Sequence, residues 1–368
     1  MKKITLYFIS IALLCTMLIS CNDDDTTNSG NPELVSVTSA TNLNIPLTSC
    51  NLGDWVVLHG KNLHNISNIV VNGVEVNMRE VFLESEKVTL QIPRALPADG
   101  EPTNAIKITN GDYAVELGMD ITIPQLYLTG LDNEWALIGD TVKINGANFD
   151  IYGITAENSQ IHFGDVPAKI TETTAGYVSV IVPEGSKRGN RITIQNNAVN
   201  MIVPGLYCDD RNLFEGFEGG FGWAGTDNMV TDGTKEGDIP SCNGKYLRIH
   251  RDHDGGWFAF IANGYVWPVE MWNNPEEWCL KFEIATNKAI NKKFVQFDQT
   301  KYIWEPWSAT EFNTYGKWKT ITLEMTDVLK DGYTQNPNDG FLFQLSLNGG
   351  DNEAVDFSLD NYRLYHKE

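Results

Sequence analysis

Apolar and polar residues alternate over short segments along most of the chain after residue 33, and Gly, Asn, Asp and Pro separate these segments. Side chains of a strand point alternately to its two faces, so this period of two is typical of half-buried β-strands joined by turns. In the last part of the chain the pattern predicts strands at Tyr246–Ile249, Trp257–Ile261, Cys279–Ile284, Phe294–Phe297, Trp318–Leu323, Phe341–Leu347 and Phe357–Leu364. The one helix or turn candidate there is Thr326–Lys330. The pattern therefore predicts an all-β protein.

The first half of this pattern contains an internal repeat. Residues 53–63 (GDWVVLHGKNL) align with residues 139–149 (GDTVKINGANF). Two further pairs follow in the same order, 88–93 (VTLQIP) with 178–183 (VSVIVP) and 106–110 (IKITN) with 192–196 (ITIQN). Three ordered matches indicate a duplication. We expect two β-sandwiches, residues 33–123 and 124–204, because about 85 to 90 residues suffice for two small sheets that cover each other.

Each repeat ends a predicted strand with a glycine and a nearby asparagine, Gly60 with Asn62 and Gly146 with Asn148. Glycine and asparagine tolerate a positive φ better than other residues. We therefore expect a left-handed backbone conformation at these two strand ends.

Tryptophan is concentrated in residues 205–368, which we assign to a third domain, a two-sheet jelly roll. Of the ten tryptophans, eight lie there: Trp223, Trp257, Trp267, Trp272, Trp278, Trp304, Trp307 and Trp318. Trp318 sits inside a regular alternating segment and Trp278 leads into one, so both are predicted core residues. Proline and asparagine interrupt the strand pattern beside Trp267, Trp272, Trp304 and Trp307. We predict that loops or strand ends hold these four rings at the surface.

Exposed aromatic rings beside polar side chains suit a sugar ligand. A pyranose packs its flat C–H face on an indole, while its hydroxyls bond to amides and carboxylates such as those of Asn273, Asn274, Gln296 and Glu305. Tyr302 and Trp304 are two residues apart and share a strand face, opposite Ile303. We predict a glycan-binding platform whose rings are Trp272, Tyr302, Trp304 and Trp307, with Trp267 as an additional candidate. The alternative is that the tryptophans only stabilise a β core.

The N-terminus predicts export. Lys2 and Lys3 precede an apolar stretch that ends in Leu18-Ile19-Ser20-Cys21, which is the charged, apolar and cleavage-region order of a secretory signal in residues 1–20. The last four residues resemble a bacterial lipobox, which implies that Cys21 carries a lipid. Residues 21–32, with three consecutive aspartates, predict an acidic tether. The run resembles the surface-export signal of outer-membrane lipoproteins; a solvated linker is the alternative.

Charge, cysteines and motifs exclude several functions. The formal net charge of -21 repels phosphate backbones and polyuronates, so nucleic acid is not an expected partner.

Besides Cys15 and Cys21, the cysteines are Cys50, Cys208, Cys242 and Cys279. They have no CxxC spacing, and their pairing stays open. His250 and Asp252 could ligate a metal, but we favour a hairpin turn at the adjacent Asp254-Gly255-Gly256.

The repeat signature Gly-Asp-x-Val-x-aliphatic-x-Gly-x-Asn resembles the immunoglobulin-like IPT/TIG fold. Together with the lipobox, the tether and the Trp-rich third domain, it resembles the surface glycan-binding proteins of outer-membrane polysaccharide-uptake systems. The segments Gly316-Lys317-Trp318 and Trp304-Glu305-Pro306-Trp307 resemble the xyloglucan-binding domain of the B type. This resemblance implies a non-catalytic lipoprotein facing the cell exterior, which captures a β-glucan such as xyloglucan beside a hydrolase and an importer.

Phe217-Glu218 and Leu359-Asp360-Asn361 resemble the first and last strands of carbohydrate-binding jelly rolls, which often hold calcium. This likeness implies Glu218 and Asp360 as oxygen ligands of a structural calcium ion; otherwise these acids cap turns. The resemblance requires no other cofactor. Two rival functions stay open, a surface endo-glycanase that uses acids such as Glu305 and an adhesin that binds protein through its immunoglobulin-like modules.

Overall fold

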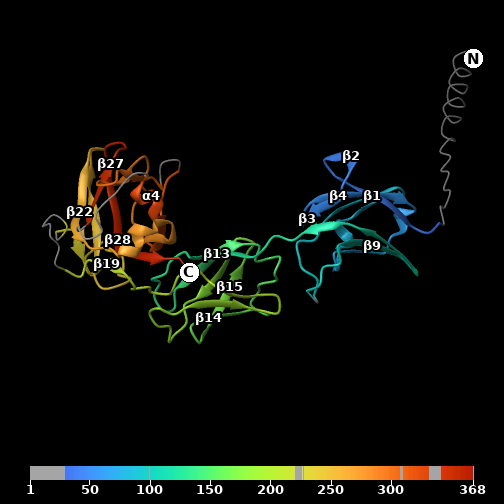
Figure 1. The fold of residues 1–368 in the computed structure, drawn as a ribbon, viewed down its shortest axis with the longest axis horizontal. Coiled ribbons are helices and arrows are strands. Elements are labelled where there is room, and N and C mark those ends of the chain that lie inside the picture. The colour runs from blue at the N-terminus through green and yellow to red at the C-terminus, as the bar shows by residue number, and fades with distance from the viewer. Residues whose placement is uncertain are drawn as a thin grey trace, which may run out of the picture. The chain divides into compact units, whose positions relative to one another are not determined.

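The computed structural model describes residues 30–98, 100–219, 226, 228–306, 310–330 and 341–367 (Figure 1). The predicted signal, the lipidation residue Cys21 and the tether up to residue 29 lie outside the described residues, as does Trp307. Contacts divide the chain into two units, residues 1–123 and 124–368. The described part is almost entirely strands and loops, which confirms the predicted all-β class. None of its helices is long and apolar enough to cross a membrane.

The first unit consists of a five-stranded sheet, β2-β1-β4-β8-β7, a four-stranded sheet, β10-β9-β5-β6, and a parallel pair, β11-β3. Its strands are β1 Glu33–Ser39, β2 Asn42–Pro46, β3 Ser49–Asn51, β4 Trp55–Lys61, β5 Asn68–Val71, β6 Val74–Glu75, β7 Phe82–Leu83, β8 Lys87–Gln91, β9 Ala105–Asn110, β10 Tyr113–Gly118 and β11 Asp120–Thr122. Two short 3-10 helices are η1 Leu63–Asn65 and η2 Met78–Glu80. Alternate residues of the central strands, including Val56, Leu58, Ile69 and Ile106, form the core.

The second unit begins with a seven-stranded array in the order β12-β13-β16-β15-β14-β17-β18. Its strands are β12 Tyr127–Leu131, β13 Thr141–Ala147, β14 Gln160–Phe163, β15 Val166–Thr173, β16 Tyr177–Ile181, β17 Ile192–Gln195 and β18 Asn200–Ile202. The first residues of β15 pair with β14 and the later ones with β16, so this strand joins the two layers. Ile144, Phe149, Phe163 and Val178 lie in the core between them.

The duplication is confirmed by the pairing of the strands. β4 lies between β1 and β8, and its counterpart β13 lies between β12 and β16. In both copies the first pair carries a bulge at the same place, between Leu34 and Ser36 and between Leu128 and Gly130.

The expected positive φ occurs at the asparagines, 58° at Asn62 and 70° at Asn148, and not at the glycines. Gly60 and Gly146 serve a different purpose. A Cβ on Gly60 would lie 1.9 Å from the carbonyl oxygen of Glu33, and one on Gly146 would lie 2.1 Å from that of Tyr127. The glycines are therefore needed because the neighbouring strand approaches closely.

The rest of the second unit is a two-sheet sandwich (Figure 1). One sheet has the order β20-β21-β28-β23-β26, with β19 also paired to β28; the other has the order β22-β27-β24-β25. The elements are β19 Leu213–Glu215, β20 Val230–Thr231, β21 Tyr246–His253, β22 Phe258–Tyr265, α3 Val269–Asn273, η3 Pro275–Glu277, β23 Trp278–Thr286, β24 Phe294–Phe297, β25 Tyr302–Trp304, β26 Lys319–Glu324, α4 Met325–Leu329, β27 Phe341–Asn348 and β28 Glu353–His366. The predicted two-sheet domain and the short helix near Thr326 are confirmed.

A buried charge cluster joins the two domains of the second unit. Arg363 of β28 bonds to Glu134, in the loop after β12, and to Glu283 of β23. Lys281 of β23 bonds to the other oxygen of Glu134, whose backbone N–H donates to the Thr320 hydroxyl on β26. These four charged side chains are at most about one-tenth exposed. Because buried charges are stable only when paired, each domain depends on the other at this boundary.

Candidate functional site

The four-stranded sheet β22-β27-β24-β25 has one face in the core and one face outside it. Along β27, Phe343 and Leu345 point into the core, and Gln344, which lies between them, points to the opposite face. The cross-strand register places Ala259, Ser346, Gln296 and Ile303 in one row across the four strands. The outer face of this sheet therefore carries amides, a hydroxyl, small side chains and the exposed Ile303.

A groove of about 510 Å³ follows this outer face. Its lining residues are Trp257, Gln296, Asp298, Gln299, Lys301, Leu342 and Gln344, and we call it the Trp257 groove. On the paired strand β22, Ala262 lies opposite Gln344 and Gly264 opposite Leu342. These small residues leave space above the sheet. The groove thus combines one large aromatic ring with several hydrogen-bonding groups.

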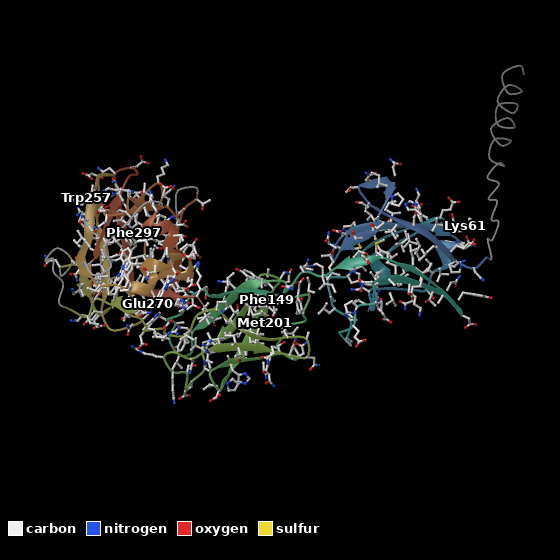
Figure 2. The ribbon with its side chains drawn as sticks, in the orientation of Figure 1. Lys61, Phe149, Met201, Trp257, Glu270 and Phe297 are labelled. Carbon is white, nitrogen blue, oxygen red and sulfur yellow. The ribbon has the colours of Figure 1, made fainter. Side chains whose placement is uncertain are left out.

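Trp257 is the exposed aromatic residue of this groove, with 57% of its surface accessible. It precedes β22 directly and lies at the margin of the domain, whereas Phe297 lies inside (Figure 2). The predicted turn before it is confirmed, since Asp254 Oδ1 accepts the N–H of Gly256 and Gly255 has a φ of 83°. It is not a hairpin turn, however, because β21 and β22 belong to different sheets.

Asp298 organises the polar side of the groove. Its Oδ1 accepts hydrogen bonds from Gln296 Nε2 at 2.6 Å, Ser346 Oγ at 2.9 Å and Trp257 Nε1 at 3.3 Å. Its backbone N–H donates to the carbonyl of Gln344 at 2.9 Å, which fixes the residue at the end of β24. Among the described residues, its Oδ2 is buried without a hydrogen-bond partner.

Two residues of the predicted platform are core residues instead. Trp267 is 2% exposed and Trp304 is 8% exposed. Tyr302 and Trp304 do share a face, as predicted, but that face points inward, where the Trp304 ring meets Phe282 edge-on at 5.2 Å. The outward residue of β25 is Ile303, which is 42% exposed. The prediction that Trp267 and Trp304 are exposed is therefore wrong. Strand alternation at β25 places the Trp304 ring in the core, and the Trp267 ring packs there against Phe214 and Phe343.

The other platform candidates are half-buried or outside the described residues. Trp272, on α3, stacks on Trp267 with ring centroids 5.7 Å apart and remains partly accessible. Tyr302 is half-buried against the core. Trp307 lies outside the described part of the chain. Trp278 and Trp318 are core residues, as predicted.

Of the groove residues, the sequence predicts Gln296 as a polar partner but does not indicate Trp257, Asp298 or Gln344. The alternation in β27 contained a usable signal, since its polar Gln344 and Ser346 mark the face opposite Phe343 and Leu345. The role of Trp257 had no such signal. A bulge between Ala259 and Ile261 changes which residues of β22 face outward, and only the pairing with β27 reveals it.

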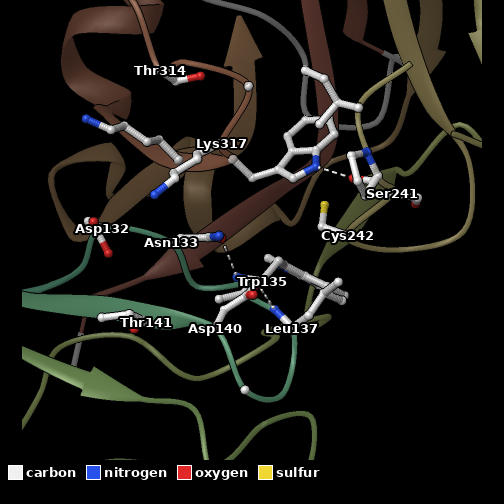
Figure 3. A pocket seen from close by; sticks show the side chains of 17 residues that line it. Asp132, Asn133, Trp135, Leu137, Asp140, Thr141, Ser241, Cys242, Thr314 and Lys317 are labelled. Atoms are coloured by element: carbon white, nitrogen blue, oxygen red, sulfur yellow. Dashed lines mark hydrogen bonds between the residues drawn. The ribbon is translucent and has the colours of Figure 1, made fainter. Parts of the chain in front are cut away.

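A second cavity, of about 470 Å³, lies between the two domains of the second unit (Figure 3). The loop carrying Asp132 and Asp140 forms one wall, and loops carrying Ser241 and Lys317 form the others (Figure 3). Its two tryptophans, Trp135 and Trp318, are at most 7% exposed, and Trp318 Nε1 donates to the carbonyl of Pro240. This cavity offers no open ring face, so the Trp257 groove is the stronger candidate for a sugar-binding site.

The two residues expected as calcium ligands, Glu218 and Asp360, accept hydrogen bonds from other groups of the protein. Asp360 is completely buried, and its two oxygens accept hydrogen bonds from the Asn361 N–H and the Cys242 thiol. Glu218 accepts the N–H of Lys245. Calcium takes six to eight oxygen ligands, and the described residues contain no group of three or more His, Cys, Asp or Glu that could hold a metal. Burial raises the pKa of Asp360 well above its usual value.

The four cysteines that the structure describes, Cys50, Cys208, Cys242 and Cys279, are free thiols. Burial raises the pKa of Cys50, Cys208 and Cys279 to about 11 in each case. The thiolate is the reactive form of cysteine, so these protonated thiols are unreactive near neutral pH.

A two-sheet domain with an open groove that combines an aromatic ring and amides, joined to an immunoglobulin-like domain, defines a modular carbohydrate-binding protein. Residues 207–366 match the family described as "Surface glycan-binding protein B xyloglucan binding domain", and residues 128–207 match the IPT/TIG domain. The C-terminal domain therefore belongs to the xyloglucan-binding-domain family of the surface glycan-binding proteins B, and an IPT/TIG domain precedes it.

Two solved structures extend this likeness along the chain. The surface glycan-binding protein PbSGBP-B from Prevotella bryantii is 18% identical, with a TM-score of 0.57, covering 92% of this chain and 99% of that one. SGBP-B from a complex xyloglucan utilization locus in Bacteroides uniformis is 16% identical, with a TM-score of 0.50, covering 92% and 100%. At these identities the likeness concerns the fold. Among curated proteins no match was found.

Proposed function

We propose that this protein is a non-catalytic surface glycan-binding protein that captures a neutral β-glucan, such as xyloglucan, in the Trp257 groove. The observation that carries the proposal is the exposed Trp257 ring beside Gln296, Asp298 and Gln344 on one open sheet face. An indole face accepts the C–H face of a sugar, and the amides and the carboxylate bond to its hydroxyls. The membership of the C-terminal domain in a xyloglucan-binding-domain family supports the ligand class.

The other rings of the predicted platform enter this proposal in a reduced role. Trp272, Tyr302 and Trp307 remain candidates for contacts beyond the groove, and Trp267 and Trp304 support the sheet from below. A single main ring and a few polar groups give modest affinity, because a hydrated glycan loses many water contacts on binding. We expect roughly micromolar to millimolar dissociation constants, about -8 to -4 kcal/mol.

The proposed location is the outer membrane, facing the cell exterior. The signal and lipobox ending at Cys21 support a lipid anchor. Anchoring suits weak sites, because many copies on one surface can engage one long polymer together. The polysaccharide would then pass to a hydrolase and an importer of the same uptake system. No cofactor is required for this binding.

The proposal is tested by affinity electrophoresis of the full chain against xyloglucan, mixed-linkage β-glucan and a polyuronate. We expect at least one neutral β-glucan to retard the wild type, and Trp257→Ala to abolish the retardation. Trp55→Ala, which removes another exposed indole, in the first unit, is the matched control and keeps wild-type mobility. Unchanged mobility of a folded Trp257→Ala protein would overturn the site.

Release of reducing ends from the same glucans distinguishes binding from hydrolysis. A glycosidase needs two carboxyl groups at a defined separation, and the proposal assigns no such pair. We expect no reducing ends above a blank. Their appearance at a rate that Glu305→Gln lowers would replace the binding function with the endo-glycanase alternative.

A further inference from the structure

One oxygen of Asp298 gathers three donors from three different parts of the groove. Gln296 comes from β24, Ser346 from β27 and Trp257 from the residue before β22. A carboxylate oxygen is a hydrogen-bond acceptor that can receive more than one donor. Asp298 therefore connects the ring and the amide that line the groove.

Asp298 itself is held firmly. It follows β24, and its N–H bonds to Gln344 on β27. The turn after it is closed by the N–H of Lys301, which donates to the carbonyl of Phe297 at 2.8 Å. A side chain fixed in this way to two strands can orient more exposed groups around it.

The two groups that Asp298 contacts need such an anchor. More than half of the Trp257 surface is exposed, so the sheet beneath the ring restrains it little. For Gln296, the bond from Nε2 determines which end of the amide faces Asp298 and leaves Oε1 as an acceptor for a sugar hydroxyl. Groups ordered before binding cost less conformational entropy when the ligand arrives.

Resting on the function proposed above, we propose that Asp298 is the positioning residue of the Trp257 groove: its Oδ1 fixes the Trp257 indole and the Gln296 amide in the orientation that receives the sugar. The acceptor, and not the negative charge, carries this role. An asparagine has the same shape and keeps the Oδ1 acceptor, whereas an alanine loses it.

The test is isothermal titration of the full chain with the β-glucan that retards it most, comparing wild type, Asp298→Ala and Asp298→Asn. We expect Asp298→Ala to weaken binding about tenfold, the size of one or two lost orienting hydrogen bonds. Asp298→Asn restores affinity to within about threefold. Asp252→Ala, an exposed aspartate on β21, is the control and binds like the wild type.

A second measurement separates positioning from loss of structure. Trp257→Phe keeps an aromatic face but removes the indole N–H that bonds to Asp298. In a double-mutant cycle with Asp298→Ala, the fold-loss of affinity of the double variant should be smaller than the product of the fold-losses of the two single variants. Both substitutions remove the same hydrogen bond, so its loss counts only once. If Asp298→Ala does not fold, Asp298→Asn is compared with Trp257→Phe instead, and Asp298→Asn must bind within about threefold of the wild type.

Two results would overturn the inference: a folded Asp298→Ala that binds like the wild type, or an Asp298→Asn as weak as Asp298→Ala. Either result leaves the proposed function intact as long as Trp257→Ala abolishes binding. If Trp257→Ala binds normally, the groove itself is not the site, and the proposed function fails at that earlier step.

Discussion

Glu134 and Arg363 form a buried salt bridge, 2.7 Å from oxygen to nitrogen, across the boundary between the IPT/TIG domain and the glycan-binding domain. Arg363 belongs to β28, the central strand of its sheet, and is completely buried. Part of the charge balance of the glycan-binding domain therefore comes from a residue outside it. This explains why residues 124–368 form one unit even though they contain two domains.

Replacing Glu134 should destabilise the second unit strongly. Glu134→Ala removes the carboxylate that pairs with Lys281 and one of the two carboxylates that pair with Arg363. Removing one partner of a buried ion pair costs about 3–5 kcal/mol, and we expect a loss of that order in the free energy of unfolding, measured by urea denaturation. The matched control is Glu33→Ala, which removes an exposed ion pair with Lys61 and should cost about 0–1 kcal/mol. Equal effects of the two variants would contradict a structural role of the cluster.

Trp304 should matter for stability and Trp257 for binding. Trp304→Ala leaves a cavity beside Phe282, and loss of a buried large aromatic residue costs about 3–5 kcal/mol. Trp257→Ala removes an exposed ring and should change the free energy of unfolding by about 0.5 kcal/mol or less. Both quantities are measured on both proteins. Trp304→Ala should lower the melting temperature, whereas Trp257→Ala should lower glucan affinity and leave the melting temperature nearly unchanged. A Trp304→Ala protein of wild-type stability that no longer binds glucan would restore Trp304 to the binding site.

Periodicity predicted the strands well because it depends only on neighbouring residues. β24 was predicted at the bounds that the structure has, and the alternation of Tyr302, Ile303 and Trp304 was assigned correctly. Periodicity does not tell which face is inside. That depends on the opposite sheet, where Phe282 packs against the Trp304 ring.

Local sequence signals also do not predict which residues form the candidate site. Local proline and asparagine suggested exposed rings at Trp267 and Trp272, but Pro268 lies immediately before a short helix that leaves Trp267 in the core. Of the three donors of Asp298, Gln296 is a near neighbour in the sequence, but Trp257 and Ser346 are 41 and 48 residues away. Such a cluster is defined by register across the sheet, which a single sequence without pairing information does not contain.

Asp360 should make the protein less stable as the pH rises. Burial raises the pKa of its carboxyl group in the folded state, so the folded protein holds a proton that the unfolded chain releases above about pH 4. The contribution of Asp360 to stability is thus complete at lower pH and is lost as the pH rises toward the folded pKa. Asp360→Asn can keep the bond from the Asn361 N–H to Oδ1, and its Nδ2 can donate to the Cys242 sulfur, without a proton to lose. The gain in unfolding free energy of Asp360→Asn over the wild type should therefore increase between pH 4 and 8 in urea titrations.

The same variant tests the calcium hypothesis for Glu218 and Asp360. A calcium ligand would be ionised, so Asp360→Asn would lower stability at neutral pH, and EDTA would lower the melting temperature of the wild type. We expect neither effect, since the oxygens of Asp360 face an N–H and a thiol. A melting temperature that EDTA lowers and added calcium restores would establish the metal site.

The glycine that the two repeats share should be irreplaceable for a reason that its φ does not reveal. In Gly146→Ala the new methyl group would lie 2.1 Å from the carbonyl oxygen of Tyr127 and 3.0 Å from the Phe149 ring. Neither the backbone of β12 nor the buried ring can move freely, and such overpacking costs about 1–3 kcal/mol. Gly176→Ala is the matched control in the same domain, because no atom lies within 4 Å of its added Cβ and its φ is not positive. Urea denaturation should show a loss of unfolding free energy only for Gly146→Ala. Equal transitions for the two variants would mean that β12 and β13 can move apart without cost. The bulge in the first strand pair would then not depend on the glycine opposite it.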